Sequence, residues 1–141
     1  MDLQTLSDRL EINDLFVRYV TALDAGDVDT IVGCFAEDGS LESPVVGIYA
    51  GRAKIREFAE RFSQFHARGT QLRHILSNLA VQLNGDRARA TCYLLTVMTR
   101  DGQSAMRPPG RYDCQLARIN GAWVFQHRLV TADAEMKLDG I

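Results

Sequence analysis

The sequence holds few of the residues that build metal centres or disulfide frameworks. Its 141 residues include three cysteines and three histidines. No C-x-x-C pair and no His/Cys cluster with metal-ligand spacing is visible. We therefore expect no metal and no other cofactor, and we expect the cysteines (Cys34, Cys92 and Cys114) to be buried, reduced thiols.

Charge of one sign and long apolar runs are also missing. Sixteen basic and 18 acidic residues give a formal net charge of -2, which leaves no basic footprint for nucleic acid. No apolar run is long enough to span a membrane. The N-terminal stretch "MDLQTLSDRLEIND" lacks the basic start and apolar centre of a signal peptide. These features favour a cytoplasmic protein whose partner is a small molecule, with neither nucleic acid nor membrane involved.

The first half of the chain has helical periodicity. Apolar residues recur three or four apart up to Leu23, and Gly26 supplies a stop. "DVDTIVGCFAEDG", residues 27–39, predicts a short second helix, and "RAKIREFAERFSQFHARG", residues 52–69, predicts a third. Residues 40–51 between them, "SLESPVVGIYAG", are expected to be extended, because Pro44 and Gly47 mark an edge or a bend.

From Gln71 onward the period changes to two. The dipeptides Asn84-Gly85, Asp101-Gly102 and Asn120-Gly121 are strong hairpin signals. They separate four predicted strands of an antiparallel meander. The chain is thus expected to form one α+β domain over residues 1–141, with three helices packed on a curved mixed or antiparallel sheet that forms a cone with an internal pocket.

Asp24 stands in an unusual place for an acid. It lies four residues after Val20 and eight after Phe16, so it shares the apolar face of the first helix. Both burial and the negative end of the helix dipole disfavour a carboxylate there. In a cone-shaped domain, Asp24 would point into the pocket instead of solid core.

His74 is the natural partner for this acid. On a strand, Leu72, His74 and Leu76 share one face, so His74 enters the pocket if that face is concave. An imidazole hydrogen-bonded to Asp24 would be held in one tautomer and become a stronger base. The plainer interpretation is a core histidine and a helix-end aspartate that makes a local turn bond. Spacing alone leaves both interpretations open.

Several stretches resemble the SnoaL-like family of the nuclear transport factor two-like superfamily. The pattern "A-L-D-A-G-D-x-D-x-I-x-x-x-F-A-E-D-G" is followed by "G-R-x-x-I-R-E-F", "R-H-I-L-S-N" and "G-R-Y-D-C-Q-L-A-R-I-N-G-A-W". The resemblance covers about Leu6 to Val130 and implies the cone-shaped α+β fold. It is strongest to the scytalone dehydratase, dehydrochlorinase and bile-acid dehydratase branch. There it implies a catalytic Asp24–His74 dyad, with Tyr19 five residues before the acid and Arg128 as the late arginine.

The sequence departs from several relatives. The lysine of the dehydrochlorinase is absent, since "VRYVTALD" offers only Arg18. The aspartate-arginine-aspartate arrangement of the epoxide hydrolase is not evident in Arg89 and Asp113. The second acid of ketosteroid isomerase would have to be Asp113, which alternates with Tyr112, so that branch ranks third.

The remaining candidate residues would bind substrate. Tyr49 and Tyr112 could donate hydrogen bonds to a carbonyl or a developing enolate, or could simply place a hydroxyl at the rim. Arg128 would suit an anionic or carbonyl-bearing substrate, or could pair with a nearby acid. Asn78 could hold substrate or satisfy a bulged strand. The expected apolar walls are Phe16, Val20, Phe58, Phe62, Leu76 and Met98.

Together these residues favour a cofactor-independent acid-base enzyme. His74, oriented by Asp24, would remove a proton next to a carbonyl, and Tyr19 would polarise that carbonyl or protonate a departing hydroxyl. The reaction would be a dehydration, an isomerisation or a cyclisation of a small, mostly apolar, ring-bearing carbonyl substrate such as a steroid or polyketide. The alternative is a non-catalytic ligand-binding or subunit module of the same fold. A homodimer is expected in either case, because Tyr93, Leu95 and Val97 form an apolar outward face.

Overall fold

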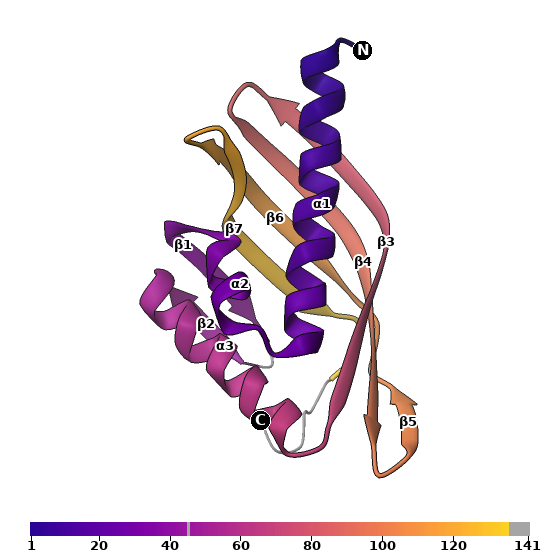
Figure 1. Cartoon of the computed structure of the whole chain (residues 1–141). Helices are drawn as coiled ribbons and strands as arrows, with labels where there is room; N and C mark the ends of the chain where they lie inside the picture. The colour runs from indigo at the N-terminus through magenta and orange to yellow at the C-terminus, as the bar shows by residue number, and fades with distance from the viewer. Residues whose placement is uncertain (45, 136–141) are drawn as a thin grey trace.

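The computed structural model describes residues 1–44 and 46–135. Within them, three helices cover the concave face of one strongly curved, mixed sheet that is not closed into a barrel (Figure 1). The strand order is β2-β1-β7-β6-β4-β3, with β5 paired to β4. The elements are α1 (Leu3–Ala25), α2 (Val28–Gly33), β1 (Phe35–Ser43), β2 (Gly47–Ala50), α3 (Arg52–Ala67), β3 (Gln71–Asn84), β4 (Arg87–Arg100), β5 (Gln103–Met106), β6 (Gly110–Ile119) and β7 (Ala122–Ala132).

The expected fold class is confirmed. Gly26 ends α1 in the left-handed conformation, at φ 67°, which glycine adopts without a Cβ penalty. It also lets α1 pass close to α3, since a Cβ at Gly26 would lie 3.2 Å from the Cα of Ser63. The last turn of α1 is therefore held against α3, beside the open end of the sheet.

The second helix is shorter than predicted. Residues 27–39 were expected to be helical, but α2 ends at Gly33 and β1 begins at Phe35. β1 runs parallel to β7, with Leu41 opposite Arg128. Pairing with a strand far along the chain therefore overrides the local helical pattern. Residue 45 of the stretch expected to be extended, and residues 136–141 of the expected domain, lie outside the described residues.

A polar network surrounds the buried Asp8 near the start of α1. One carboxylate oxygen of this buried residue accepts hydrogen bonds from Arg118 (2.7 Å), from the indole nitrogen of Trp123 (3.1 Å) and from Gln4 (2.9 Å). Burial alone would raise the pKa of Asp8, but these three donors lower it overall. The network ties the start of α1 to β6 and β7.

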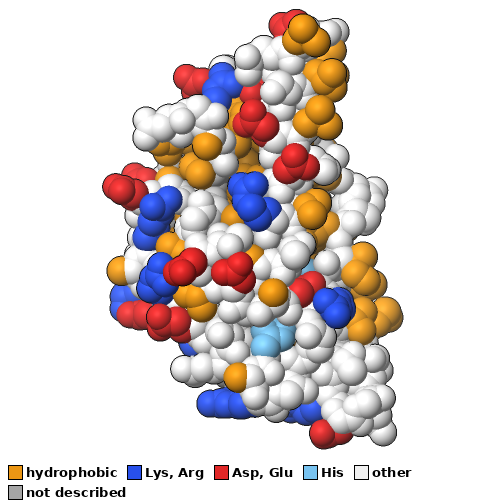
Figure 2. Space-filling view, viewed as in Figure 1, with side chains coloured by type: hydrophobic (Ala, Val, Ile, Leu, Met, Phe, Trp, Pro, Cys, Tyr) orange, Lys and Arg blue, Asp and Glu red, His pale blue; other side chains and the backbone are white. Residues whose placement is uncertain are grey.

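The outer side of the first half of α1 keeps apolar side chains in solvent. Leu3, Leu6 and Leu10 are exposed, and Figure 2 shows hydrophobic side chains along the outer side of this helix. No helix within the described residues is long and apolar enough to cross a membrane.

Candidate active site

The Asp24 carboxylate and the His74 imidazole are in direct contact. The Nδ1 atom of His74 lies 2.6 Å from Oδ1 of Asp24. The backbone N–H of His74 also donates to both oxygens of the same carboxylate, at 3.2 and 3.1 Å. The two side chains are only 7% and 12% exposed, so water screens this interaction little. Because Nδ1 faces the carboxylate, Nε2 is the ring nitrogen left for a substrate.

The fold explains how an acid is accommodated at this position. β3 is an edge strand, so the His74 N–H is free of the sheet ladder and can bind the carboxylate. Side chains outside α1 also hydrogen-bond to the carbonyls at its negative, C-terminal end. The amide of Gln71 donates to the Asp24 carbonyl at 2.8 Å, and Nε2 of His66 lies 2.8 Å from the Leu23 carbonyl. These groups compensate the helix-end carbonyls that would otherwise disfavour Asp24.

His74 opens onto a pocket between the helices and the concave sheet. Its ring lies 6.3 Å from the ring of Phe62, centroid to centroid. The free space is about 60 Å³, well below the ~150 Å³ of an engineered cavity known to hold benzene. A ring-sized ligand therefore has to move lining side chains apart. The lining residues are Tyr19, Leu23, Leu41, Ser43, Val46, Phe58, Phe62, Leu72, His74, Leu94, Thr96, Tyr112, Arg128 and Val130.

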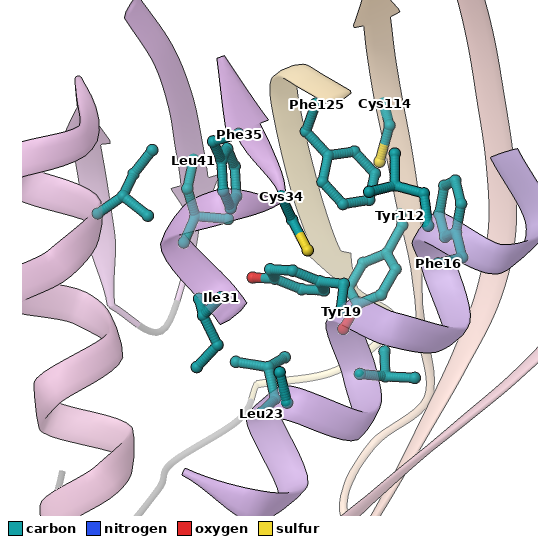
Figure 3. Close-up of a cluster of buried hydrophobic side chains, with 14 of the residues drawn as sticks. Phe16, Tyr19, Leu23, Ile31, Cys34, Phe35, Leu41, Tyr112, Cys114 and Phe125 are labelled. Carbon is teal, nitrogen blue, oxygen red and sulfur yellow. The ribbon is translucent and has the colours of Figure 1, made fainter. Parts of the chain in front are cut away.

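Arg128 forms a second polar point in this pocket. Its side chain is 1% exposed, and its guanidinium carbon lies 3.7 Å from the ring centroid of Tyr112 and 4.2 Å from that of Tyr19. Figure 3 shows these two rings next to each other, with Phe125 beside Tyr19. Burial raises the pKa of both phenols. Tyr19 and Tyr112 therefore stay protonated at neutral pH and can donate a hydrogen bond.

Six of the residues predicted from the sequence line the pocket together: Tyr19, Phe58, Phe62, His74, Tyr112 and Arg128. Asp24 stands behind His74 and contacts it without itself lining the free space. Residues from α1, α3, β3, β6 and β7 thus meet at one place.

The other predicted residues lie elsewhere. Asn78 is exposed, with φ 57°, where the β3–β4 register shifts, so the bulge carries it away from the concave face. Tyr49 packs on Phe58, and its hydroxyl accepts a hydrogen bond from Arg61 at 2.6 Å instead of facing the pocket.

Four predicted apolar wall residues belong to the surrounding core. Phe16 packs edge-on against Phe125, with 5.2 Å between ring centroids. Val20 is buried in the same core, and Leu76 and Met98 pack against its margin. None of the four reaches the pocket lining.

Thr96 is a pocket residue that was not predicted from the sequence. It is 7% exposed and lies opposite His74 in the β3–β4 register. The signal was present, because Thr96 continues the inward alternation of Cys92 and Leu94 on β4. Ser43 and Val46 were missed as well, since the pairing of β1 with β7 that brings them here is not visible locally.

The described residues do not form a group of metal ligands. They contain no group of three or more His, Cys, Asp or Glu side chains placed to hold a metal ion. The polar groups of the described residues at the site are an imidazole–carboxylate pair, two neutral phenols, the hydroxyls of Ser43 and Thr96, and a guanidinium.

Comparison with known proteins agrees with this architecture. An uncharacterized protein of Mycobacterium tuberculosis, Rv2910c, is 30% identical over 129 residues, which cover 89% of this chain and 86% of that protein. The structure of a variant of Rv3472, a protein of unknown function from the same species, has a TM-score of 0.84 at 26% identity and covers 94% of this chain and 75% of that one. An NTF2-like protein with a cystatin-like fold from Novosphingobium aromaticivorans has a TM-score of 0.82 at 26% identity, covering 99% and 87%. The family model described as the SnoaL-like domain matches residues 4–129, so the chain belongs to the SnoaL-like family.

Proposed function

We propose that this protein is a cofactor-independent acid-base enzyme whose catalytic base is His74. The observation that carries the proposal is the 2.6 Å contact of His74 Nδ1 with Asp24, made by a ring whose other side faces the pocket. A carboxylate on one nitrogen fixes the tautomer and stabilises the imidazolium that forms when the other nitrogen takes a proton. Asp24 is the positioning residue and His74 the catalytic one.

The proposed reaction begins at a carbon next to a carbonyl. Nε2 of His74 takes a proton from that carbon, and the C–H electron pair forms an enolate. In a dehydration, the enolate electrons form the new C=C bond as the C–O bond on the neighbouring carbon breaks. The departing hydroxyl takes the proton from the His74 imidazolium and leaves as water, which returns His74 to its neutral form. In an isomerisation, the imidazolium returns its proton to a different carbon.

The lining supports a substrate with an apolar body. Leu23, Phe58, Phe62 and Leu72 surround the space beside His74, and aromatic and aliphatic walls of this kind suit ring-bearing compounds. A steroid or polyketide fragment with a carbonyl is therefore the proposed substrate class.

Proton removal can be tested before the substrate is known. Ring ketones are incubated with the protein in D₂O, and loss of the α-proton signals is followed by NMR. Wild type should exchange these protons faster than buffer, and His74→Gln should lose roughly 10²–10⁴-fold of the rate. His127→Gln, which alters a partly exposed histidine outside the pocket lining, is the matched control and should retain activity. Exchange by His74→Gln within tenfold of wild type would reject the proposal and leave a binding module.

We also propose that the protein is a homodimer joined through the outer face of its sheet. Ile75 and Tyr93 are 51% and 56% exposed on neighbouring strands of that face, and Met106 of β5 is 70% exposed. Covering such a patch removes apolar surface from water. Light scattering should give twice the chain mass for wild type and a shift toward monomer for Tyr93→Arg. A monomeric wild type would rule the dimer out.

A further inference from the structure

Arg128 is a buried cation that has no neutralising partner within residues 1–44 and 46–135. Among the described residues no carboxylate lies within ion-pair distance of it. Its Nη1 donates a 3.5 Å hydrogen bond to the sulfur of Cys114, and its buried Nε has no hydrogen-bond partner within the described part of the chain. A guanidinium taken out of water needs charge or hydrogen bonds to offset the lost hydration.

The surrounding groups cannot supply that charge at neutral pH. Burial raises the pKa of Cys114 to about 12 and that of Cys92 to about 11. Burial likewise raises the pKa of Tyr19 and of Tyr112. Thiols and phenols alike are therefore neutral, and the ring faces provide cation–π attraction without any net negative charge.

The position of this cation relative to His74 sets the size of its ligand. Arg128 stands on β7 and His74 on β3, and β6 and β4 lie between these two strands in the sheet. Neighbouring strands are about 4.8 Å apart, so the two residues start from backbones that are three strand spacings apart along the sheet. The oxygen of a carbonyl beside the reacting carbon would lie much closer to His74 than this. Arg128 is thus placed for a group on the far side of the substrate.

We propose that Arg128 binds a carboxylate of the substrate, carried on the opposite side of a ring from the carbon that His74 attacks. The placement of the reacting carbon rests on the proposed acid-base function, but the carboxylate subsite does not. A carboxylate would neutralise the guanidinium and accept hydrogen bonds from its edge, while Tyr19 and Tyr112 keep its two faces covered. The ring would lie among the apolar side chains between the two polar points. The preferred substrates are therefore cyclic oxo-acids, not neutral ring ketones.

Binding tests this independently of catalysis. The probe is a cyclohexanone that carries a carboxylate on the carbon opposite the ketone, and its neutral counterpart is the corresponding carboxamide. Dissociation constants are measured by ¹H–¹⁵N NMR titration. Wild type should bind the acid at least tenfold more tightly than the amide. Arg128→Met should abolish this preference, and Arg111→Met, which removes an exposed arginine from β6, should keep it. A well-dispersed ¹H–¹⁵N spectrum of the protein establishes that Arg128→Met is folded. If Met at this position disrupts folding, Arg128→Lys, which retains the charge, is used in its place and should keep part of the preference for the acid.

The two proposals fail in different ways. His74→Gln should keep the tenfold preference for the acid while it loses proton exchange. A preference for the acid without any exchange by wild type would reject the acid-base function and leave the carboxylate subsite in place. Equal dissociation constants for acid and amide, absence of acid binding, or a preference that survives in Arg128→Met would each overturn the subsite.

Discussion

Removing the Asp24 carboxylate should cost the protein a measurable part of its stability. The carboxylate accepts a charge-assisted bond from the His74 ring and a shared bond from the His74 backbone N–H. A hydrogen bond to a charged group contributes about 1.5–3 kcal/mol, and a backbone bond about 0.5–1.5 kcal/mol. Removing an acid from the negative end of a helix returns about 0.3–1 kcal/mol. Asp24→Ala should therefore lower the free energy of unfolding by about 1–4 kcal/mol.

A double-mutant cycle separates the two contributions. His74→Ala deletes the ring but leaves the backbone N–H, so Asp24→Ala made in that background should cost at most about 1.2 kcal/mol, the backbone bond less the gain at the helix end. The remainder, about 1.5–3 kcal/mol, should appear as the coupling energy between the two side chains.

Urea unfolding followed by circular dichroism is the measurement, with the slope m compared among all four proteins to exclude changes in the denatured state. Asp29→Ala, which removes an exposed acid from α2, is the matched control and should change stability little. A coupling energy below about 0.5 kcal/mol, less than a single weak hydrogen bond contributes, would refute the assigned role of the carboxylate.

Two further predictions concern acid stability and thiol reactivity. Because the pKa of Asp8 is lowered from its ordinary value of 3.8, its contribution is complete well above that value and disappears as the pH falls through the lower native value. The stability difference between wild type and Asp8→Asn should therefore shrink as the pH falls from about 5 to below 3.8, as measured by urea unfolding. Burial raises the pKa of Cys92 to about 11 and that of Cys114 to about 12. Because the thiolate is the reactive species, both cysteines should react slowly with Ellman's reagent at about pH 8. The rate should be at least about a hundredfold below that of a thiol whose pKa is about 9.

Each of these predictions has a contradicting result. A wild-type and Asp8→Asn difference that stays constant with pH would mean that the ionised carboxylate is not what Trp123 and Arg118 stabilise. Rapid labelling of Cys92 or Cys114 in the folded protein would mean that the core around Arg128 opens readily. Full labelling after addition of guanidinium chloride provides the control that the thiols are reduced.

The parts of the site that follow from local periodicity could be predicted. The face shared by Phe16, Val20 and Asp24 follows from helical spacing, and the inward face of His74 follows from strand alternation. Their meeting could not be derived from the residues alone, because the partners stand 50 residues apart. The resemblance to the SnoaL-like family supplied that pairing.

Longer-range register accounts for what the sequence did not reveal. The Arg128 guanidinium lies between two tyrosine rings because Arg128 pairs with Cys114, diagonally across from Tyr112 on β6, while α1 brings Tyr19 against it. In β3 the irregularity falls at Asn78 and turns it outward, which agrees with the bulged strand expected as the alternative there. Bulges of one residue reverse which side chains face inward, and the alternating pattern of β6 and β7 does not mark the one between Gln115 and Leu116.

The parallel pairing of β1 with β7 has a consequence for biosynthesis. β1 lies in the first third of the chain, yet the strand that covers its edge ends at Ala132. The sheet can therefore not be completed until nearly the whole chain has left the ribosome. Contacts of such long sequence separation form slowly. Until then the edge of β1 that pairs with β7 is open, so we expect the nascent chain to depend on chaperones. Because Arg128 is among the last residues of β7 to be added, we expect the pocket to assemble late.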